Sequence, residues 1–348
     1  MSKSRAAAGR APRVAALLAA ALLAACTPRP DAPYPSAAQV LPDSGPLPLA
    51  MVKRMLLVDG ARTDGRVVAV GDRGYILLSD DEGASWRRAS SPVAPLLTAV
   101  DFLDAKHGWA VGHDSVILAT ADGGQTWTQR FSAPSEERPL LDVLFLDATR
   151  GIAVGAYGAY YETGDGGRTW AARKIIAEDR HFNGILRLPS RASVGGLDPR
   201  RLMIVGEEGT ILVSDDDGGT WRKLASPYKG SLFGGVVAAD GSVVAFGLRG
   251  KIFRSSDGGE TWAAVQNDST ATLMGGSRLP DGAIVLVGGA GTVLASRDDG
   301  RTFARIARAE SARTYSTAIA AERGEAMILG EGGAREVPLP AAGKAAAR

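Results

Sequence analysis

The chain has 348 residues, of which 40 are basic and 38 acidic, so its formal net charge is +2. The first 25 residues hold four of the basic residues and no acidic one, which leaves 36 basic against 38 acidic residues, or −2, on the remainder. These nearly equal numbers of basic and acidic residues exclude the strongly basic surface by which many proteins bind nucleic acid. The single cysteine, Cys26, excludes an intramolecular disulfide.

The N-terminal 25 residues have the pattern of an export signal. Four basic residues precede the apolar stretch 14–25, which is shorter than the roughly 20 residues that span a bilayer. The stretch ends in Leu23-Ala24-Ala25-Cys26, which resembles the lipobox of bacterial lipoproteins. The resemblance implies cleavage before Cys26 and acylation of its thiol. Otherwise, Cys26 is a stray small residue at the end of an ordinary signal.

Residues 26–48 are rich in Pro, Ala and Ser without periodicity, so they are expected to form a flexible tether. Thr27 follows the cysteine where, in lipoproteins, an aspartate would indicate inner-membrane retention. The resemblance therefore implies a membrane-anchored lipoprotein facing the periplasm, in the outer membrane if the source is Gram-negative.

From residue 79 onward an eight-residue box, Ser/Thr-x-Asp-x-Gly-x-Thr/Ser-aromatic, occurs six times. Its starts are 41, 43, 51, 41 and 41 residues apart, the spacing of a repeated structural unit. The hydroxyl and carboxylate side chains can close a turn by bonding backbone N–H groups, and the aromatic residue can pack against a neighbouring unit. We interpret these residues as structural, not catalytic: Asp81, Asp122, Asp165, Asp216, Asp257, Asp298, Trp86, Trp127, Trp170, Trp221, Trp262 and Phe303.

A second signature, apolar-x-apolar-Gly-x-x-Gly-x-apolar, occurs seven times between residues 67 and 337. Each copy predicts two strands joined by a tight turn, with one strand before it and one after the box. The sequence therefore predicts an all-β fold, a seven-bladed β-propeller of four-stranded antiparallel blades over residues 49–340, with the first strand at 51–58 and a disordered tail at 341–348. The seventh copy has no box after it, so we expect residues 46–50 or their flank to supply the missing strand; the alternative is that the seventh unit is a ragged cap.

The boxes resemble those of bacterial neuraminidase repeat (BNR, or Asp-box) proteins. Gly108-Trp109-Ala110-Val111-Gly112 with the box at 120–127 resembles, more narrowly, the photosystem II stability/assembly factor family and its relatives in non-photosynthetic bacteria. That resemblance implies a non-enzymatic binding protein that holds subunits of a membrane-protein complex during assembly. It implies a membrane or envelope protein as the partner and no cofactor.

The turns between second and third strands and the connections between blades are expected to share one face, with the boxes on the opposite rim. The connection 174–186 is the longest and mixes charged with aromatic side chains, a composition that favours recognition. Glu136, Glu137 and Arg138 lie on another connection. The predicted partner-binding residues are Arg73, His113, Asp114, Tyr157, Arg180, His181, Phe182, Asn183, Glu207 and Arg249.

The alternative functions are a sialidase-like glycoside hydrolase and a glycan-binding module. Sialidases share the box but need an arginine triad and a tyrosine nucleophile. Arg73, Arg180 and Arg249 with Tyr157 could supply these residue types, although no spacing supports the grouping. Three histidines and one cysteine give no basis for a metal site or a Cys/His dyad.

Overall fold

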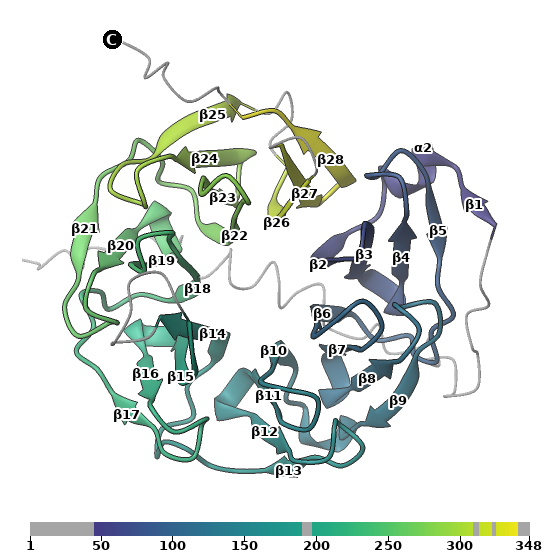
Figure 1. Cartoon of the computed structure of the whole chain (residues 1–348), viewed down its shortest axis with the longest axis horizontal. Helices are drawn as coiled ribbons and strands as arrows, with labels where there is room; N and C mark the ends of the chain where they lie inside the picture. The colour runs from purple at the N-terminus through teal and green to yellow at the C-terminus, as the bar shows by residue number, and fades with distance from the viewer. Residues whose placement is uncertain (1–44, 190–196, 309–312, 322–324, 340–348) are drawn as a thin grey trace, which may run out of the picture. The chain divides into compact units, whose positions relative to one another are not determined.

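The computed structural model describes residues 45–189, 197–308, 313–321 and 325–339. Within residues 45–339, seven antiparallel sheets follow one another around a ring, each with its first strand at the centre (Figure 1). This arrangement is a seven-bladed β-propeller, and the predicted fold class is confirmed. The expectations for residues 1–25, for most of the tether and for the tail at 341–348 lie outside the described residues.

Blades one to three contain most of the N-terminal half of the chain. Their strands are β2 Leu57–Thr63, β3 Arg66–Gly71, β4 Ile76–Ser79 and β5 Trp86–Arg88; β6 Leu97–Phe102, β7 Gly108–Gly112, β8 Ile117–Thr120 and β9 Thr128–Phe131; and β10 Leu140–Phe145, β11 Gly151–Gly155, β12 Tyr160–Thr163 and β13 Ala171–Ala172.

Blades four to six follow the same plan, whereas the sheet of blade seven has three strands among the described residues. Their strands are β14 Phe182–Pro189, β15 Leu197–Gly206, β16 Ile211–Ser214 and β17 Arg222–Lys223; β18 Leu232–Val237, β19 Val243–Gly247, β20 Ile252–Ser255 and β21 Ala263–Val265; β22 Leu273–Arg278, β23 Ile284–Gly288, β24 Thr292–Ser296 and β25 Ala304–Arg308; and β26 Tyr315–Ala320, β27 Ala326–Gly330 and β28 Gly333–Val337. The enlarged 51-residue interval falls on the long β14–β15 hairpin.

The box closes the turn between third and fourth strands by the bonds that its side chains can make. In blade five, Ser255 Oγ accepts from Gly259 N at 2.8 Å and donates to Asp257 Oδ1 at 2.7 Å. Asp257 Oδ1 also accepts from Thr261 N at 2.9 Å, and Trp262 Nε1 donates to Gly259 O at 2.9 Å. Gly259 has φ +95°, a conformation that a side chain would strain. In blade three the equivalent bonds from Thr169 hold the pKa of Asp165 well below its usual range.

The second strands end in a glycine because the backbone of the preceding connection passes too close to leave room for a side chain. Gly112 has φ −175°, which any residue adopts, but a Cβ at this position would lie 2.1 Å from Leu96 O. A Cβ added at Gly71, Gly155 or Gly247 would likewise lie 2.1–2.2 Å from a backbone oxygen of the preceding connection. The repeated glycine therefore lets each blade connection cross the end of its own second strand.

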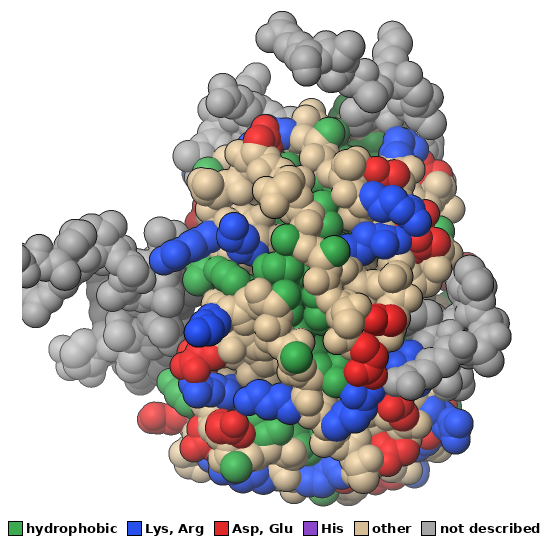
Figure 2. Space-filling view, turned by 90° about the vertical axis from the view of Figure 1, so that its left-hand side faces the viewer, with side chains coloured by type: hydrophobic (Ala, Val, Ile, Leu, Met, Phe, Trp, Pro, Cys, Tyr) green, Lys and Arg blue, Asp and Glu red, His purple; other side chains and the backbone are tan. Residues whose placement is uncertain are grey.

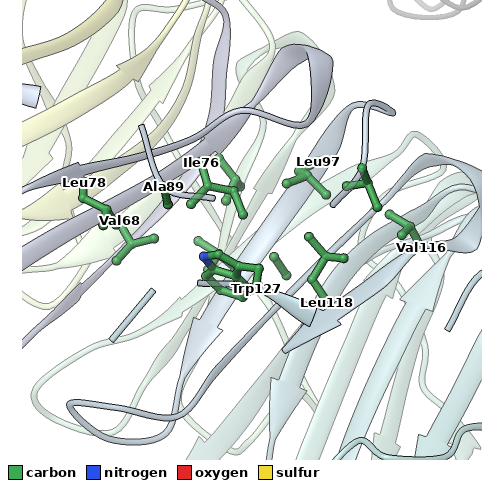
Figure 3. Close-up of a cluster of buried hydrophobic side chains, with 12 residues drawn as sticks. Val68, Ile76, Leu78, Ala89, Leu97, Val116, Leu118 and Trp127 are labelled. Carbon is green, nitrogen blue, oxygen red and sulfur yellow. The ribbon is translucent and has the colours of Figure 1, made fainter. Parts of the chain in front are cut away.

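Apolar side chains from adjacent blades interlock and form the core. Between blades one and two, Leu78, Leu97, Leu118 and Trp127 belong to one cluster of buried side chains (Figure 3). Phe102 meets the Trp127 ring edge-on with ring centroids 6.1 Å apart. Each box aromatic residue thus packs against the preceding blade, as the sequence predicts: Trp86, Trp127 and Phe303 are buried, and Trp170, Trp221 and Trp262 are half-buried.

The N-terminal end of the propeller differs from the expectation in two respects. Pro46–Leu47 forms strand β1, which pairs with β5 on the outside of blade one, so the prediction that residues 46–50 complete blade seven is wrong. Residues 49–52 form a one-turn helix, α2 Leu49–Val52, and the first strand starts at Leu57 instead of Met51. Pro48, which cannot donate to a ladder, separates β1 from the helix.

Candidate partner-binding face

Five turns between second and third strands have the same short 3₁₀ geometry: η1 Asp72–Gly74, η2 His113–Ser115, η4 Ala156–Gly158, η5 Glu207–Gly209 and η6 Leu248–Gly250. The central residue of each has a left-handed backbone, with φ between 50° and 60° for Arg73, Asp114, Tyr157, Glu208 and Arg249. This conformation turns the central side chain outward, and four of these five side chains carry charge.

These turns and the blade connections lie on one face, which we call the loop face. Ala133 N donates to Asp114 O at 2.9 Å, and Gly158 N donates to Arg180 O at 2.8 Å, so each turn contacts the connection that leaves its own blade. The boxes instead bond the turn between first and second strands, as Gly166 N does to Thr149 O at 2.7 Å. The boxes therefore lie on the opposite rim.

Part of the loop face is a compact group at the junction of blades three and four, the Tyr157 cluster: Tyr157, Arg180, His181, Glu207 and Glu208. The Tyr157 side chain is 48% exposed and meets the His181 ring edge-on with centroids 4.7 Å apart. His181 Nδ1 lies 3.3 Å from Tyr157 N and 3.4 Å from Glu207 Oε2. Arg180 is ion-paired with Glu208. The cluster thus presents one exposed aromatic ring framed by charges of both signs.

A hollow of about 230 Å³ adjoins Tyr157 on the side of blade three. Arg138, Tyr161 and Arg173 contribute to its lining, together with Glu178 and Asp179 of the connection. Tyr161 Oη donates to Glu136 Oε2 at 2.6 Å, and burial, followed by this carboxylate, raises the pKa of Tyr161 to about 12. The hollow can accept a peptide side chain that makes both apolar and polar contacts.

Two of the predicted contact residues belong to strand β14 and are held by neighbouring blades. Phe182 is 0% exposed and packs in the core between blades three and four, because β14 already starts at this residue. Asn183 Nδ2 donates to Leu232 O at 2.8 Å and so links blades four and five. Burial excludes Phe182 as a ligand contact, whereas Asn183 is half-buried and its predicted contact stays a prediction.

The remaining predicted residues are spread around the ring. Arg73 lies on blade one beside Asp72 at 3.5 Å, Arg249 is exposed on blade five, and both are remote in the fold from Arg180. His113 on blade two is half-buried, and burial lowers its pKa. The three arginines considered as a sialidase triad thus belong to three separate parts of the loop face.

The outer wall beside β17 and β21 carries charged side chains of both signs. On the wall beside β17 and β21, blue and red side chains are interspersed (Figure 2). Lys223 Nζ lies 3.2 Å from Glu178 Oε1, and Arg222 is ion-paired with Glu260. This side of the wall therefore offers no uniformly charged surface.

Sequence reasoning did not find three carboxylates on the first strands, at the centre of the ring. Asp59 Oδ2 accepts from Val100 N at 3.0 Å, Asp101 Oδ2 from Phe145 N at 2.8 Å, and Asp142 Oδ2 from Ile185 N at 2.8 Å. Each carboxylate thus bonds the first strand of the next blade. Burial and mutual repulsion raise the pKa of Asp142 to about 8, and burial raises that of Asp59 to about 6. An aspartate in an otherwise apolar first strand was the available signal.

Within the described parts of the chain, no group of three or more His, Cys, Asp or Glu side chains is placed to hold a metal ion. Among those same residues, no helix has the length and apolar character needed to cross a membrane.

The arrangement of boxes and blades matches a known family. A family model described as Photosynthesis system II assembly factor YCF48 matches residues 78–138 and 131–287, which together cover 210 of the 348 residues. The chain belongs to this family. YCF48 relatives also appear in local sequence matches: the photosystem II stability/assembly factor HCF136 of Cyanidioschyzon merolae is 42% identical over 50 residues, and that of Guillardia theta 43% over 58.

These local matches are short. They cover 14% and 15% of this chain and only 11% and 15% of the two relatives. The Ycf48 assembly protein of Thermosynechococcus vestitus is 38% identical over 45 residues, which is 13% of each chain.

Solved structures show the shared fold over nearly the whole chain. A structure of YCF48 bound to D1 peptide aligns with a TM-score of 0.64 and 21% identity, over 88% of this chain and 98% of that one. An ancestral GH74 enzyme aligns with a TM-score of 0.68 at 11% identity, over 86% of this chain and 46% of that one. At such identities the likeness concerns the fold alone, which assembly factors and enzymes share.

Proposed function

We propose that this protein is an exported, lipid-anchored and non-enzymatic scaffold that holds an extended segment of a membrane protein while an envelope complex is assembled. Membership of the YCF48 family carries the proposal, because members of that family bear the names of assembly and stability factors. A family structure contains a bound D1 peptide, which supports a membrane-protein segment as the kind of partner.

The Tyr157 cluster is the contact site that the geometry favours. An exposed aromatic ring beside a hollow gives a peptide an apolar anchor, and the surrounding charges fix its orientation. Arg180 and Glu208 are already paired, so a partner with its own charged side chain exchanges one ion pair for another. Specificity then comes from where the charged side chains lie, since the exchange of one surface ion pair for another contributes little net free energy.

Site-specific crosslinking in the native membrane tests this site. We expect the variant with Tyr157→Ala, Arg180→Ala and His181→Ala to lose its crosslinked membrane-protein partner, with the thermal transition of the propeller unchanged within a few degrees. The matched control is Arg73→Ala with Arg249→Ala, on the same face but on other blades, which should retain the partner. Equal loss in both variants would move the site away from the cluster, and no loss in either would remove the loop face from the proposal.

The lipid anchor has its own test. Cys26→Ala removes the thiol that is acylated in lipoproteins, so the variant should leave the membrane fraction for the soluble periplasmic fraction. A variant that remains in the membrane fraction as wild type does would show that Cys26 is not the anchor. Turnover of a fluorogenic glycoside that is abolished by Tyr157→Phe would replace the scaffold with a glycoside hydrolase.

A further inference from the structure

Helix α2 carries an exposed apolar surface that the fold does not use. Among the described residues, four large apolar side chains are exposed, and two of them, Leu49 at 44% and Met51 at 41%, belong to this single turn. Pro48 and Ala50 are exposed as well, so residues 48–51 form a continuous apolar patch, the α2 patch. Single exposed apolar side chains are common on protein surfaces, whereas a run of adjacent ones marks a site of contact.

The fold holds this turn in place by its inner side. Met51 N donates to Pro48 O at 2.8 Å, so the backbone of the turn is bonded within itself. Val52 is 2% exposed and packs in the cluster of apolar side chains between blades one and seven. At about 100° per residue, the stretch from Leu49 to Met51 lies on the side away from Val52. The stability of the propeller therefore does not account for the apolar character of these outward side chains.

Basic side chains follow the α2 patch directly. Lys53 and Arg54 are exposed, and neither has an ion-pair partner among the described residues. The carboxylates of Glu325 and Glu336 line a groove on one side of α2, but Met51 and Arg54 do not line it. Apolar side chains bordered by Lys and Arg are typical of segments that lie in the interface of an anionic bilayer, where the cations meet lipid phosphates. The patch thus combines apolar contact with unpaired positive charge.

We propose that residues 48–54 are a membrane contact, by which the propeller rests on a bilayer that contains anionic phospholipid. A single turn presents far less than the roughly 800 Å² that each partner buries in a typical protein interface, whereas contact with a bilayer needs only a few protruding apolar side chains. Two such side chains bind weakly by themselves, so the contact needs a second attachment and rests on the proposed lipid anchor. Only residues 27–44 separate Cys26 from the described chain, so an acylated Cys26 would keep α2 close to the bilayer.

The contact sets the orientation of the ring on the membrane. Helix α2 lies at the outer edge of the propeller, between β28 and β5, and blades three and four lie across the ring from it (Figure 1). A propeller held at α2 therefore stands on its edge, with the loop face directed along the membrane and the Tyr157 cluster raised above it. This position suits the capture of an extended segment that a membrane protein extends out of the bilayer.

Quenching of a fluorophore by lipid tests the contact without relying on acylation. The chain with Cys26→Ser, and with a histidine tag in place of residues 1–25, is tethered to vesicles of phosphatidylcholine and phosphatidylglycerol that contain a nickel-chelating lipid. A fluorophore on Ala50→Cys should be quenched by nitroxide-labelled lipid about threefold more than the same fluorophore on Leu103→Cys, an exposed position on blade two.

Two sets of substitutions separate the apolar from the charged part of the contact. Leu49→Ser with Met51→Ser should reduce quenching at Ala50→Cys to the level of Leu103→Cys and leave the thermal transition unchanged, because both side chains are exposed. Lys53→Gln with Arg54→Gln should reduce quenching about twofold on vesicles with phosphatidylglycerol, and not on vesicles of phosphatidylcholine and the nickel-chelating lipid alone.

Three results would overturn the membrane contact. Equal quenching at Ala50→Cys and Leu103→Cys would show that α2 does not meet the lipid. Quenching that survives Leu49→Ser with Met51→Ser would show that the fluorophore inserts by itself. A fluorophore that becomes shielded from water without vesicles, as the protein concentration rises, would assign the patch to a second copy of the chain. Because the tag supplies the tether, failure of the α2 contact is seen separately from failure of the lipid anchor at Cys26.

Discussion

Asp142 makes the stability of the propeller depend on pH across the neutral range. Its carboxylate bonds Ile185 N at 2.8 Å from the wall of the central channel, where burial and the charges of Asp59 and Asp101 raise its pKa to about 8. An unfolded chain would titrate this group near 3.8. The folded state therefore holds an extra proton between these values, and its stability falls as pH rises through this window.

The size of the effect follows from the linkage between proton binding and folding. One proton held only by the folded state lowers the free energy of unfolding by at most ~1.4 kcal/mol per pH unit. The Asp142 side chain is partly accessible to solvent, which screens part of the repulsion, so we expect Asp142 alone to account for about 1–2 kcal/mol between pH 5 and 7. Asp142→Asn keeps an oxygen acceptor for Ile185 N and cannot ionise. The free energy of unfolding of this variant should therefore change less with pH than that of wild type. The variant should also be more stable than wild type at pH 8.

Urea unfolding followed by tryptophan fluorescence, at several pH values from 5 to 8, measures this slope. The control is Asp147→Asn in the same blade: hydrogen bonds from Thr149 hold the pKa of Asp147 far below its usual range, so it stays ionised throughout the window. Its removal should lower stability by a constant amount and leave the slope as in wild type. An Asp142→Asn variant whose slope equals that of wild type would refute the role of the channel carboxylates.

Two further changes test the architecture by thermal and urea unfolding. Trp127→Ala should lower the free energy of unfolding by about 3–5 kcal/mol, because the ring is buried between blades one and two. Trp127→Phe should lower it by about 1 kcal/mol, since this variant loses chiefly the 2.8 Å hydrogen bond to Gly124 O. Gly112→Ala should cost several kcal/mol, as its Cβ would fall 2.1 Å from Leu96 O, whereas Gly65→Ala, with open space but φ +77°, should cost about 1 kcal/mol. Equal losses for the two glycine variants would contradict the close-approach explanation.

The repeats made the fold predictable, because the same local bonds recur in six boxes. Ser255 and Asp257 close their turn with partners within six residues, so the pattern is visible in the sequence. The pairing of strands at the two ends of the ring was harder to predict from the sequence. Whether Pro46–Leu47 joins blade one or blade seven depends on contacts between residues far apart in sequence, and the pairing with β5 follows from no local signal.

The candidate site was predictable only in part. The left-handed turns placed Tyr157 and Glu207 on one face, and the long connection placed Arg180 and His181 beside them. Phe182 was misassigned because an apolar residue that starts a strand looks, in sequence, like an aromatic residue that ends a loop. Its burial depends on blade three, and that neighbour cannot be read from residues 174–186.

The junction of blades one and seven gives the ring a weakest point. The other neighbouring blades are joined by a chain connection, but no described residues connect blade seven to blade one. Packing of side chains such as Leu57 and Leu329, with bonds from Gly332 N and Gly333 N to Met55 O, holds these two blades together. Thermal opening should start at this junction, so a circular permutant with its old ends linked and new ends cut at any other blade boundary would lose more cooperativity than the natural chain order.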